Sequence, residues 1–290
     1  MVARTDIQID RPVKGRPHEG KVLAVVAPHS DDCPLFAGGT VARLIGEGYT
    51  AYFIMLCNDE GDSFDLSVGQ TTAHIEADNL IMANALGVKE VFVLNYKNHF
   101  LDQVPPTEVR SRLVLLLRHL KVDTMFTFDP AAPFEMNPEH VYCARHAEYC
   151  CFLAGGRLDF PEQIAAGIKP HRVREKYYWA RGEHAVNRVV DISETIERKV
   201  DAICACKTEV GYMVKGLRES LRRQGLRLPI LEADEPTAIR NYVDVCFRAH
   251  SKTAGERYGL AYAEEFRYVG PYYWPEELGH YVDKNAVPAK

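Results

Sequence analysis

The hexapeptide APHSDD, at residues 27–32, places an imidazole and two carboxylates next to one another in the chain. His29 and Asp32 are three residues apart, so a turn between them could direct both side chains at one divalent ion. Asp31 would then stay free, and a carboxylate beside a metal-bound water can accept a proton during attack on a carbonyl. The hexapeptide therefore predicts a metal-dependent hydrolase with Asp31 as the catalytic base.

A structural interpretation of the same hexapeptide stays open, in which Ser30, Asp31 or Asp32 caps the next helix and His29 is a hydrogen-bonded turn residue. A catalytic zinc site takes three protein ligands, so the metal hypothesis needs a third residue. His140, in the later stretch NPEH, is the candidate. Like His29 it follows a predicted strand, and two strand ends of one parallel sheet can converge on one crevice. We expect His29, Asp32 and His140 to bind Zn²⁺ or another divalent metal.

The segments around these motifs alternate between strand and helix patterns. Apolar runs at residues 21–27, 50–57, 91–95 and 123–128 are typical of buried parallel strands. Helical patterns separate them, the first with Pro34 in its first turn and the others at residues 71–86 and 107–120. The alternation predicts an α/β fold with a mostly parallel sheet that helices cover on both faces.

The second half of the chain has a less regular pattern. Helices are predicted at residues 139–155, 193–224 and 236–257, with an optional break at Gly211, and strands at residues 176–180 and 186–192. We expect an N-terminal arm at residues 1–20, a single domain at residues 21–270 with an irregular C-terminal extension, and a tail at residues 271–290. The aromatic-rich tail would pack on the domain or on a partner subunit, which allows a homo-oligomer.

The composition is that of an ordinary globular protein, with 47% hydrophobic and 26% charged residues. The net charge of −5 and the absence of a long Lys/Arg run argue against a nucleic-acid partner. The start of the chain has no apolar signal region, and no later segment reaches the run of about 20 apolar residues that a membrane span needs. We therefore expect a cytoplasmic protein with no membrane partner. Its eight cysteines mostly fall in apolar patterns and are predicted to be free thiols.

The pair APHSDD and NPEH resembles the two sequence motifs of the LmbE/PIG-L family of zinc-dependent N-deacetylases, and the resemblance extends over residues 21–269. Looser matches are NDEGDS at residues 58–63, ALGV at residues 85–88 and YAEEF at residues 262–266. The resemblance implies a Rossmann-like three-layer sandwich, zinc on His29, Asp32 and His140, and Asp31 as the general base. It also implies a small-molecule or glycoside substrate, an N-acetylamino sugar or a related glycoside that loses its acetyl group.

Three positions depart from the family pattern. Ser30 stands in place of Pro, Cys33 in place of Glu, and Asn137 where many members have a His that serves as general acid or oxyanion donor. Asn can donate a hydrogen bond but cannot deliver a proton. We therefore expect Asp31 to pass its proton to the leaving amine, while zinc and Asn137 polarise the carbonyl oxygen.

Four other residues are candidates for substrate binding, together with Asn137. Asn58 and Asp59 follow the second predicted strand and could bind sugar hydroxyls, although a solvated acidic turn explains them nearly as well. His99 and His184 fall in predicted loops, where a pocket residue is more common than in a helix.

Two rival functions remain. The first is a Rossmann-type nucleotide-dependent enzyme, which the fold alone would suit, but no G-x-G-x-x-G follows the first strand. The second is a non-catalytic sugar-binding relative of the family. Asp31 argues against this second function, whereas Asn137 leaves it open.

Overall fold

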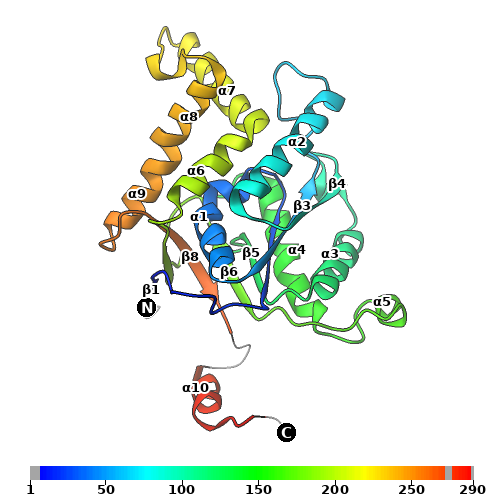
Figure 1. Ribbon diagram of the computed structural model, residues 1–290. Helices are drawn as coiled ribbons and strands as arrows, with labels where there is room; N and C mark the ends of the chain where they lie inside the picture. Colours follow the sequence, from blue (N-terminus) through cyan, green and yellow to red (C-terminus); the bar gives the residue numbers. More distant parts are fainter. Residues whose placement is uncertain (1–6, 272–275, 289–290) are drawn as a thin grey trace.

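The structure is a computed structural model that describes residues 7–271 and 276–288. Eight strands form one sheet in the order β1-β7-β8-β6-β5-β2-β3-β4 (Figure 1). Only β8 is antiparallel to its neighbours, β6 and β7, among the described strand pairs. The expected α/β fold with a mostly parallel sheet is confirmed. The strands are β1 Gln8–Asp10, β2 Val22–Ala27, β3 Thr50–Cys57, β4 Glu90–Tyr96, β5 Thr124–Phe128, β6 Glu175–Trp179, β7 Arg188–Asp191 and β8 Ala263–Val269.

Helices cover both faces of this sheet. Successive side chains of a strand point to opposite faces, so Val25 of β2 packs in one core and Val26 in the other. Helices α1, α2 and α6 contribute to the core around Val25, and α3 and α4 contribute to the core around Val26 (Figure 1). The helices are α1 Asp32–Gly46, α2 Val68–Leu86, α3 Pro106–Leu120, α4 Pro138–Ala154, α5 Pro161–Ala165, α6 Ile196–Ala205, α7 Lys207–Arg223, α8 Glu235–Val243, α9 Ala249–Glu256 and α10 Glu276–Asn285, with short helical turns η1 Leu101–Gln103, η2 Pro229–Leu231 and η3 Asp244–Arg248.

The helical run that follows β7 differs from its prediction. It begins at Ile196, and the chain turns at Cys206 between α6 and α7, so the predicted break at Gly211 was wrong. Gly211 lies inside α7 against α8, where Glu235 and Ile239 are its nearest neighbours. Packing on α8 thus outweighs the cost of about 1 kcal/mol that a glycine adds to a helix interior.

The ends of the chain add two elements to the predicted pattern. Residues 8–10 of the expected N-terminal arm form β1, which pairs in parallel with β7 at one edge of the sheet. Helix α10 lies at the bottom of the view in Figure 1. The prediction that the tail packs on the domain or on a partner falls partly on residues 272–275 and 289–290, outside the described residues. Within the described ranges, every helix is too short or too polar to cross a membrane. All eight cysteines are free thiols, and six of them are buried.

Candidate active site

The turn between β2 and α1 directs His29 and Asp32 toward one point. Oδ2 of Asp32 accepts the backbone N–H of His29 at 3.0 Å and lies 3.5 Å from His29 Nδ1. Asp31 is the N-cap of α1, but its side chain makes no capping hydrogen bond. The capping interpretation therefore does not account for Asp31, which is buried at 6% exposure without a capping bond.

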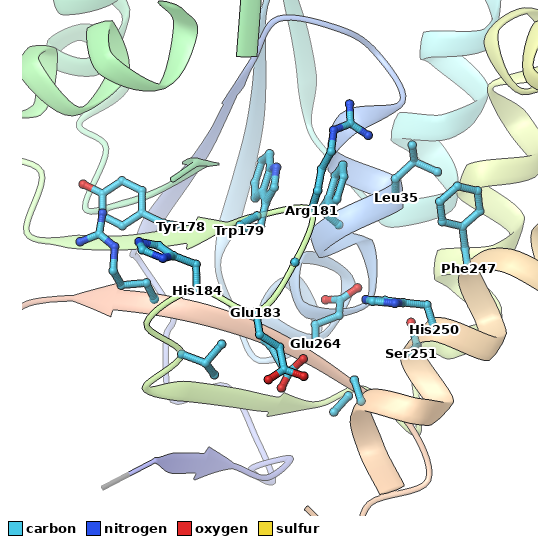
Figure 2. A pocket seen from close by; sticks show the side chains of 18 of the residues that line it. Leu35, Tyr178, Trp179, Arg181, Glu183, His184, Phe247, His250, Ser251 and Glu264 are labelled. Carbon is cyan, nitrogen blue, oxygen red and sulfur yellow. The ribbon is translucent and has the colours of Figure 1, made fainter. Parts of the chain in front are cut away.

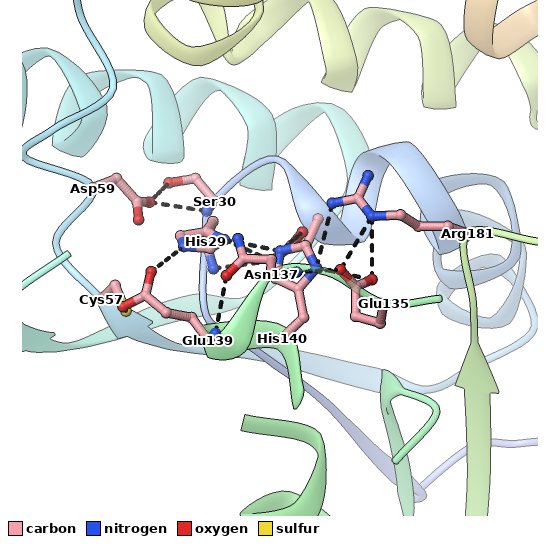
Figure 3. Close-up of polar contacts among 10 residues, drawn as sticks. His29, Ser30, Cys57, Asp59, Glu135, Asn137, Glu139, His140 and Arg181 are labelled. Atoms are coloured by element: carbon pink, nitrogen blue, oxygen red, sulfur yellow. Dashed lines mark hydrogen bonds and ion pairs between the residues drawn. The ribbon is translucent and has the colours of Figure 1, made fainter. Parts of the chain in front are cut away.

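Helix α4 brings His140 to the same point. Asn137 caps this helix through Oδ1, which accepts the backbone N–H of Glu139 at 2.9 Å. His140 Nε2 lies 3.2 Å from His29 Nδ1 and 3.4 Å from Oδ1 of Asp32 (Figure 3). Tetrahedral ligands with zinc bonds of about 2.0–2.1 Å are about 3.3 Å apart. The three side chains thus have the mutual spacing of ligands to one zinc ion.

Two glutamates determine which ring nitrogen of each histidine faces inward. Oε2 of Glu139 lies 2.9 Å from His29 Nε2, and Oε2 of Glu135 lies 3.2 Å from His140 Nδ1 (Figure 3). A carboxylate can only accept, so each ring donates its outer N–H and directs a lone pair inward. Two lone pairs 3.2 Å apart beside the Asp32 carboxylate repel unless a cation or a proton lies between them. This set of donors fits a divalent metal.

Glu135 and Glu139 are site residues that the sequence prediction missed. Burial alone would raise the pKa of Glu139, but its hydrogen bond with His29 lowers this pKa to about 2. The pKa of Glu135 is likewise lowered to about 2, against the effect of burial, by its hydrogen bond with His140. Both carboxylates are therefore charged partners of the rings. Histidines that bind a metal usually donate their other ring N–H to a carboxylate. Both glutamates lie close to His140 in the stretch FEMNPEH, so this rule could have identified them as candidates.

Asp31 lines the pocket of about 200 Å³ that also contains His29, Asp32 and His140. No described residue donates a hydrogen bond to its carboxylate. Burial, and then the negative charge of Asp32, raise the pKa of Asp31 well above its usual range. A buried carboxylate with free lone pairs can exchange a proton with a small molecule in the same pocket.

Two of the predicted substrate residues, His99 and Asn137, line this pocket. His99 has a φ of +67° and Asp59, at the end of the neighbouring strand, has a φ of +50°. Residues other than glycine rarely adopt this left-handed region, although Asp, Asn and His do so more often than most. The loops after β3 and β4 thus each contain a residue with an uncommon backbone conformation beside the candidate metal ligands.

The other three predicted substrate residues lie outside the pocket wall. Asn58 bonds within its own loop, where its Nδ2 donates to Oε2 of Glu60 at 2.8 Å. Oδ2 of Asp59 accepts the backbone N–H and the hydroxyl of Ser30, each at 3.0 Å, so Asp59 holds the turn that carries the ligands. His184 lies 3.8 Å from a carboxylate oxygen of Asp129 and lines a neighbouring cavity.

That neighbouring cavity has a volume of about 560 Å³ and lies among α1, the β6–β7 loop, α9 and β8. Leu35, Phe36 and Arg181 line both cavities, so the two lie side by side. In Figure 2, Leu35 and Arg181 lie in the upper part of the view, above His250 and Ser251. The pocket that holds His29, Asp32 and His140 therefore adjoins a second, larger cavity.

The part of the chain that holds this site is similar to known deacetylases. Residues 24–151 match the PIG-L family, described as GlcNAc-PI de-N-acetylase. The matched range contains both APHSDD and NPEH. Diacetylchitobiose deacetylase of Thermococcus kodakarensis is 26% identical to this chain over 217 residues, which are 70% of this chain and 74% of the relative.

Solved structures share the fold of this chain. N,N'-diacetylchitobiose deacetylase from Pyrococcus horikoshii superposes with a TM-score of 0.69 at 24% identity, over 90% of this chain and 89% of that chain. GalB, the 4-carboxy-2-hydroxymuconate hydratase of Pseudomonas putida, gives a TM-score of 0.63 at 16% identity, over 88% of this chain and 99% of that chain. One fold thus serves a deacetylase and a hydratase, so the reaction must be inferred from the site.

Proposed function

We propose that this protein is a metal-dependent deacetylase that removes the acetyl group of an N-acetylated amino sugar or related glycoside. The observation that carries the proposal is the convergence of His29, Asp32 and His140 around one point, with the Asp31 carboxylate in the same pocket. Two imidazoles and one carboxylate suit Zn²⁺, and another divalent metal is the alternative. The PIG-L match and the diacetylchitobiose deacetylase relative support the substrate class.

The chain's own residues supply the proton transfers. Zinc, when bound, polarises the amide carbonyl and makes a nearby water more acidic. Asp31 takes a proton from the attacking water and gives it to the amide nitrogen, so that the C–N bond breaks and acetate and a free amine leave. Because Oδ1 of Asn137 is occupied as a helix cap, its Nδ2 is the atom that donates to the carbonyl oxygen. Asn137 thereby stabilises charge without providing a proton.

The experiment that tests this function measures acetate and free amine released from N-acetylglucosamine, N,N'-diacetylchitobiose and a non-sugar acetamide by the zinc-loaded protein. Equal amounts of acetate and amine from the sugars support the deacetylase. A protein that binds zinc and these sugars but releases no acetate would instead be the sugar-binding relative. Nucleotide binding with no acetate release would favour the nucleotide-dependent rival.

The size of the two cavities predicts a preference for the longer sugar. Small-molecule sites usually enclose about 300–1,000 Å³, so the catalytic pocket of about 200 Å³ holds only the N-acetyl end of a glycoside. The rest would extend past Phe36 and Arg181 into the adjoining cavity. We expect kcat/KM to be at least about tenfold higher for N,N'-diacetylchitobiose than for N-acetylglucosamine, equivalent to about 1.4 kcal/mol of added binding. Equal values would contradict the use of the second cavity.

Glu139 is expected to tune the metal site through His29. Glu139→Gln keeps the size of the side chain but removes the charge that orients the ring, so zinc affinity should fall by about 10–100-fold. The measurement is a competition titration of zinc against a chelator. Glu148→Gln is the matched control, because Glu148 lies on the same helix and accepts from Tyr178 instead. Unchanged zinc affinity in Glu139→Gln would show that the ring needs no charged partner.

Four further expectations from the sequence remain predictions. They are the single domain at residues 21–270, the cytoplasmic location, the absence of a nucleic-acid partner and the homo-oligomer. Gel filtration with light scattering tests the last of these directly.

A further inference from the structure

A second cluster of carboxylates adjoins the candidate zinc ligands, and two of its three members, Asp62 and Glu209, line the same pocket. Asp59 and Asp62 come from the β3–α2 loop and Glu209 comes from the first turn of α7. One oxygen of each side chain lies within 4.8 Å of the other two. Asp59 is 1% exposed, Glu209 is 4% exposed and Asp62 is half-buried. The chain therefore holds three acids close together with little access to water.

The cluster lacks a lysine or arginine partner within the described residues, and the basic side chains that act on it are the His29 and His99 rings. No lysine or arginine there forms an ion pair with Asp59, Asp62 or Glu209, and Oδ1 of Asp59 and Oε2 of Glu209 are buried without a hydrogen-bond partner. Burial, and then the charges of Asp31 and Asp59, raise the pKa of Glu209 well above its usual range. Buried carboxylates are normally paired with a cation or bound to a metal, because an isolated buried charge is costly. The two unpaired oxygens point to a missing positive ion.

We propose that Asp59, Asp62 and Glu209 bind a hard divalent cation, with Ca²⁺ as the best fit. Every donor in the cluster is a carboxylate oxygen, the ligand that Ca²⁺, Mg²⁺ and Mn²⁺ prefer, whereas the candidate zinc site contributes two nitrogens. Ca²⁺ bonds of about 2.3–2.6 Å place opposite ligands up to about 5 Å apart, and three oxygens within 4.8 Å of one another can share such an ion. Mg²⁺ requires shorter bonds and a stricter geometry.

A cation at this cluster would connect α7 to the turn between β2 and α1, which carries His29, Asp31 and Asp32. Oδ2 of Asp59 already accepts two hydrogen bonds from Ser30, which stands between His29 and Asp31 in the chain. With Oδ1 and Oδ2 both engaged, Asp59 would be fixed between the cation and this turn. The cation is therefore a positioning element for the turn. This consequence rests on the proposed deacetylase, whereas the binding of the cation does not.

Cation binding can be measured without turnover, on the full-length protein with its first site loaded with zinc. The probes are CaCl₂ in a calorimetric titration and MnCl₂ followed by electron paramagnetic resonance. We expect one Ca²⁺ or Mn²⁺ per chain, and a rise in Tm of about 5 °C at a Ca²⁺ concentration about 100-fold above Kd. Glu209→Gln and Asp62→Asn should each weaken binding by at least about tenfold, since each removes one charged ligand. Glu219→Gln, an exposed glutamate on the same helix, should change nothing.

Two variants, His140→Ala and Asp62→Asn, separate loss of the second cation from loss of zinc and from unfolding. His140→Ala, which alters the zinc site, should still bind Ca²⁺, so loss of deacetylation and loss of the second cation are distinguishable. Circular dichroism checks folding, and Asp62→Asn serves in place of Glu209→Gln if that variant does not fold. Wild-type protein that binds neither Ca²⁺ nor Mn²⁺ at about 10 mM, well above the Kd of weak calcium modules, overturns the proposal. Equal binding by wild type and both cluster variants overturns it as well.

Discussion

Replacement of Asp31 by Asn should lower kcat for acetate release by about 10²–10⁴-fold while zinc stays bound. Asn has nearly the same size as Asp but cannot accept the proton of the attacking water or return it to the leaving amine. Since the Asp31 side chain accepts no hydrogen bond from the described residues and makes no cap, the fold should lose little by this change. Steady-state kinetics and elemental analysis of the same preparation measure both quantities.

A control separates this effect from a general change of charge. Asp65→Asn removes a carboxylate at the surface, where Asp65 pairs with Lys215 at 2.9 Å, and should leave kcat near the wild-type value. Activity of Asp31→Asn near that of wild type, with zinc still bound, would remove Asp31 from the mechanism. Another group would then have to carry the proton.

Replacement of His140 by Ala should abolish zinc binding and, with it, acetate release. The variant keeps His29 and Asp32, and two ligands fall short of the three that a catalytic zinc site normally takes. Elemental analysis of dialysed protein should show zinc reduced by at least about tenfold relative to wild type. Metal content is the direct readout, and loss of activity follows from it.

Two further variants guard against an unfolded protein as the cause. The His140 ring stacks on Phe128 with centroids 4.0 Å apart, so Ala also removes packing. His140→Gln retains more of that packing and should lose zinc as well. His119→Ala, on an exposed part of α3, should keep both zinc and activity. Full zinc content in a folded His140→Ala variant would show that the metal is bound elsewhere.

The sheet and the central ligands could be predicted because their signals are local. Buried parallel strands are continuous apolar runs, so β2, β3 and β5 were found almost at their observed bounds. Both motifs follow such strands directly. The rule that strand ends of a parallel sheet meet at one edge was then enough to predict that His140 and His29 lie close together, and the structure places their ring nitrogens 3.2 Å apart.

The residues around the ligands could not be predicted in the same way, because their partners are distant in the sequence. Glu139 looks like a glutamate in the first turn of a helix, where the helix dipole favours it in any case. Glu209 belongs to α7, and only the packing of α7 places it beside Asp59. Asp59 was expected to bind a sugar hydroxyl or to lie in a solvated turn, yet it is 1% exposed and bonds to Ser30. Burial of polar groups depends on tertiary contacts that no local pattern encodes.

The central claim is that acetate release depends on a metal held by His29, Asp32 and His140. The most direct test strips metal from wild-type protein, restores one equivalent of zinc, and records zinc content and acetate release from N,N'-diacetylchitobiose at each step. We predict about one zinc per chain, loss of activity with the metal, and recovery of both together. Wild-type protein that deacetylates equally well without metal, or that takes up zinc and never releases acetate, would contradict the account.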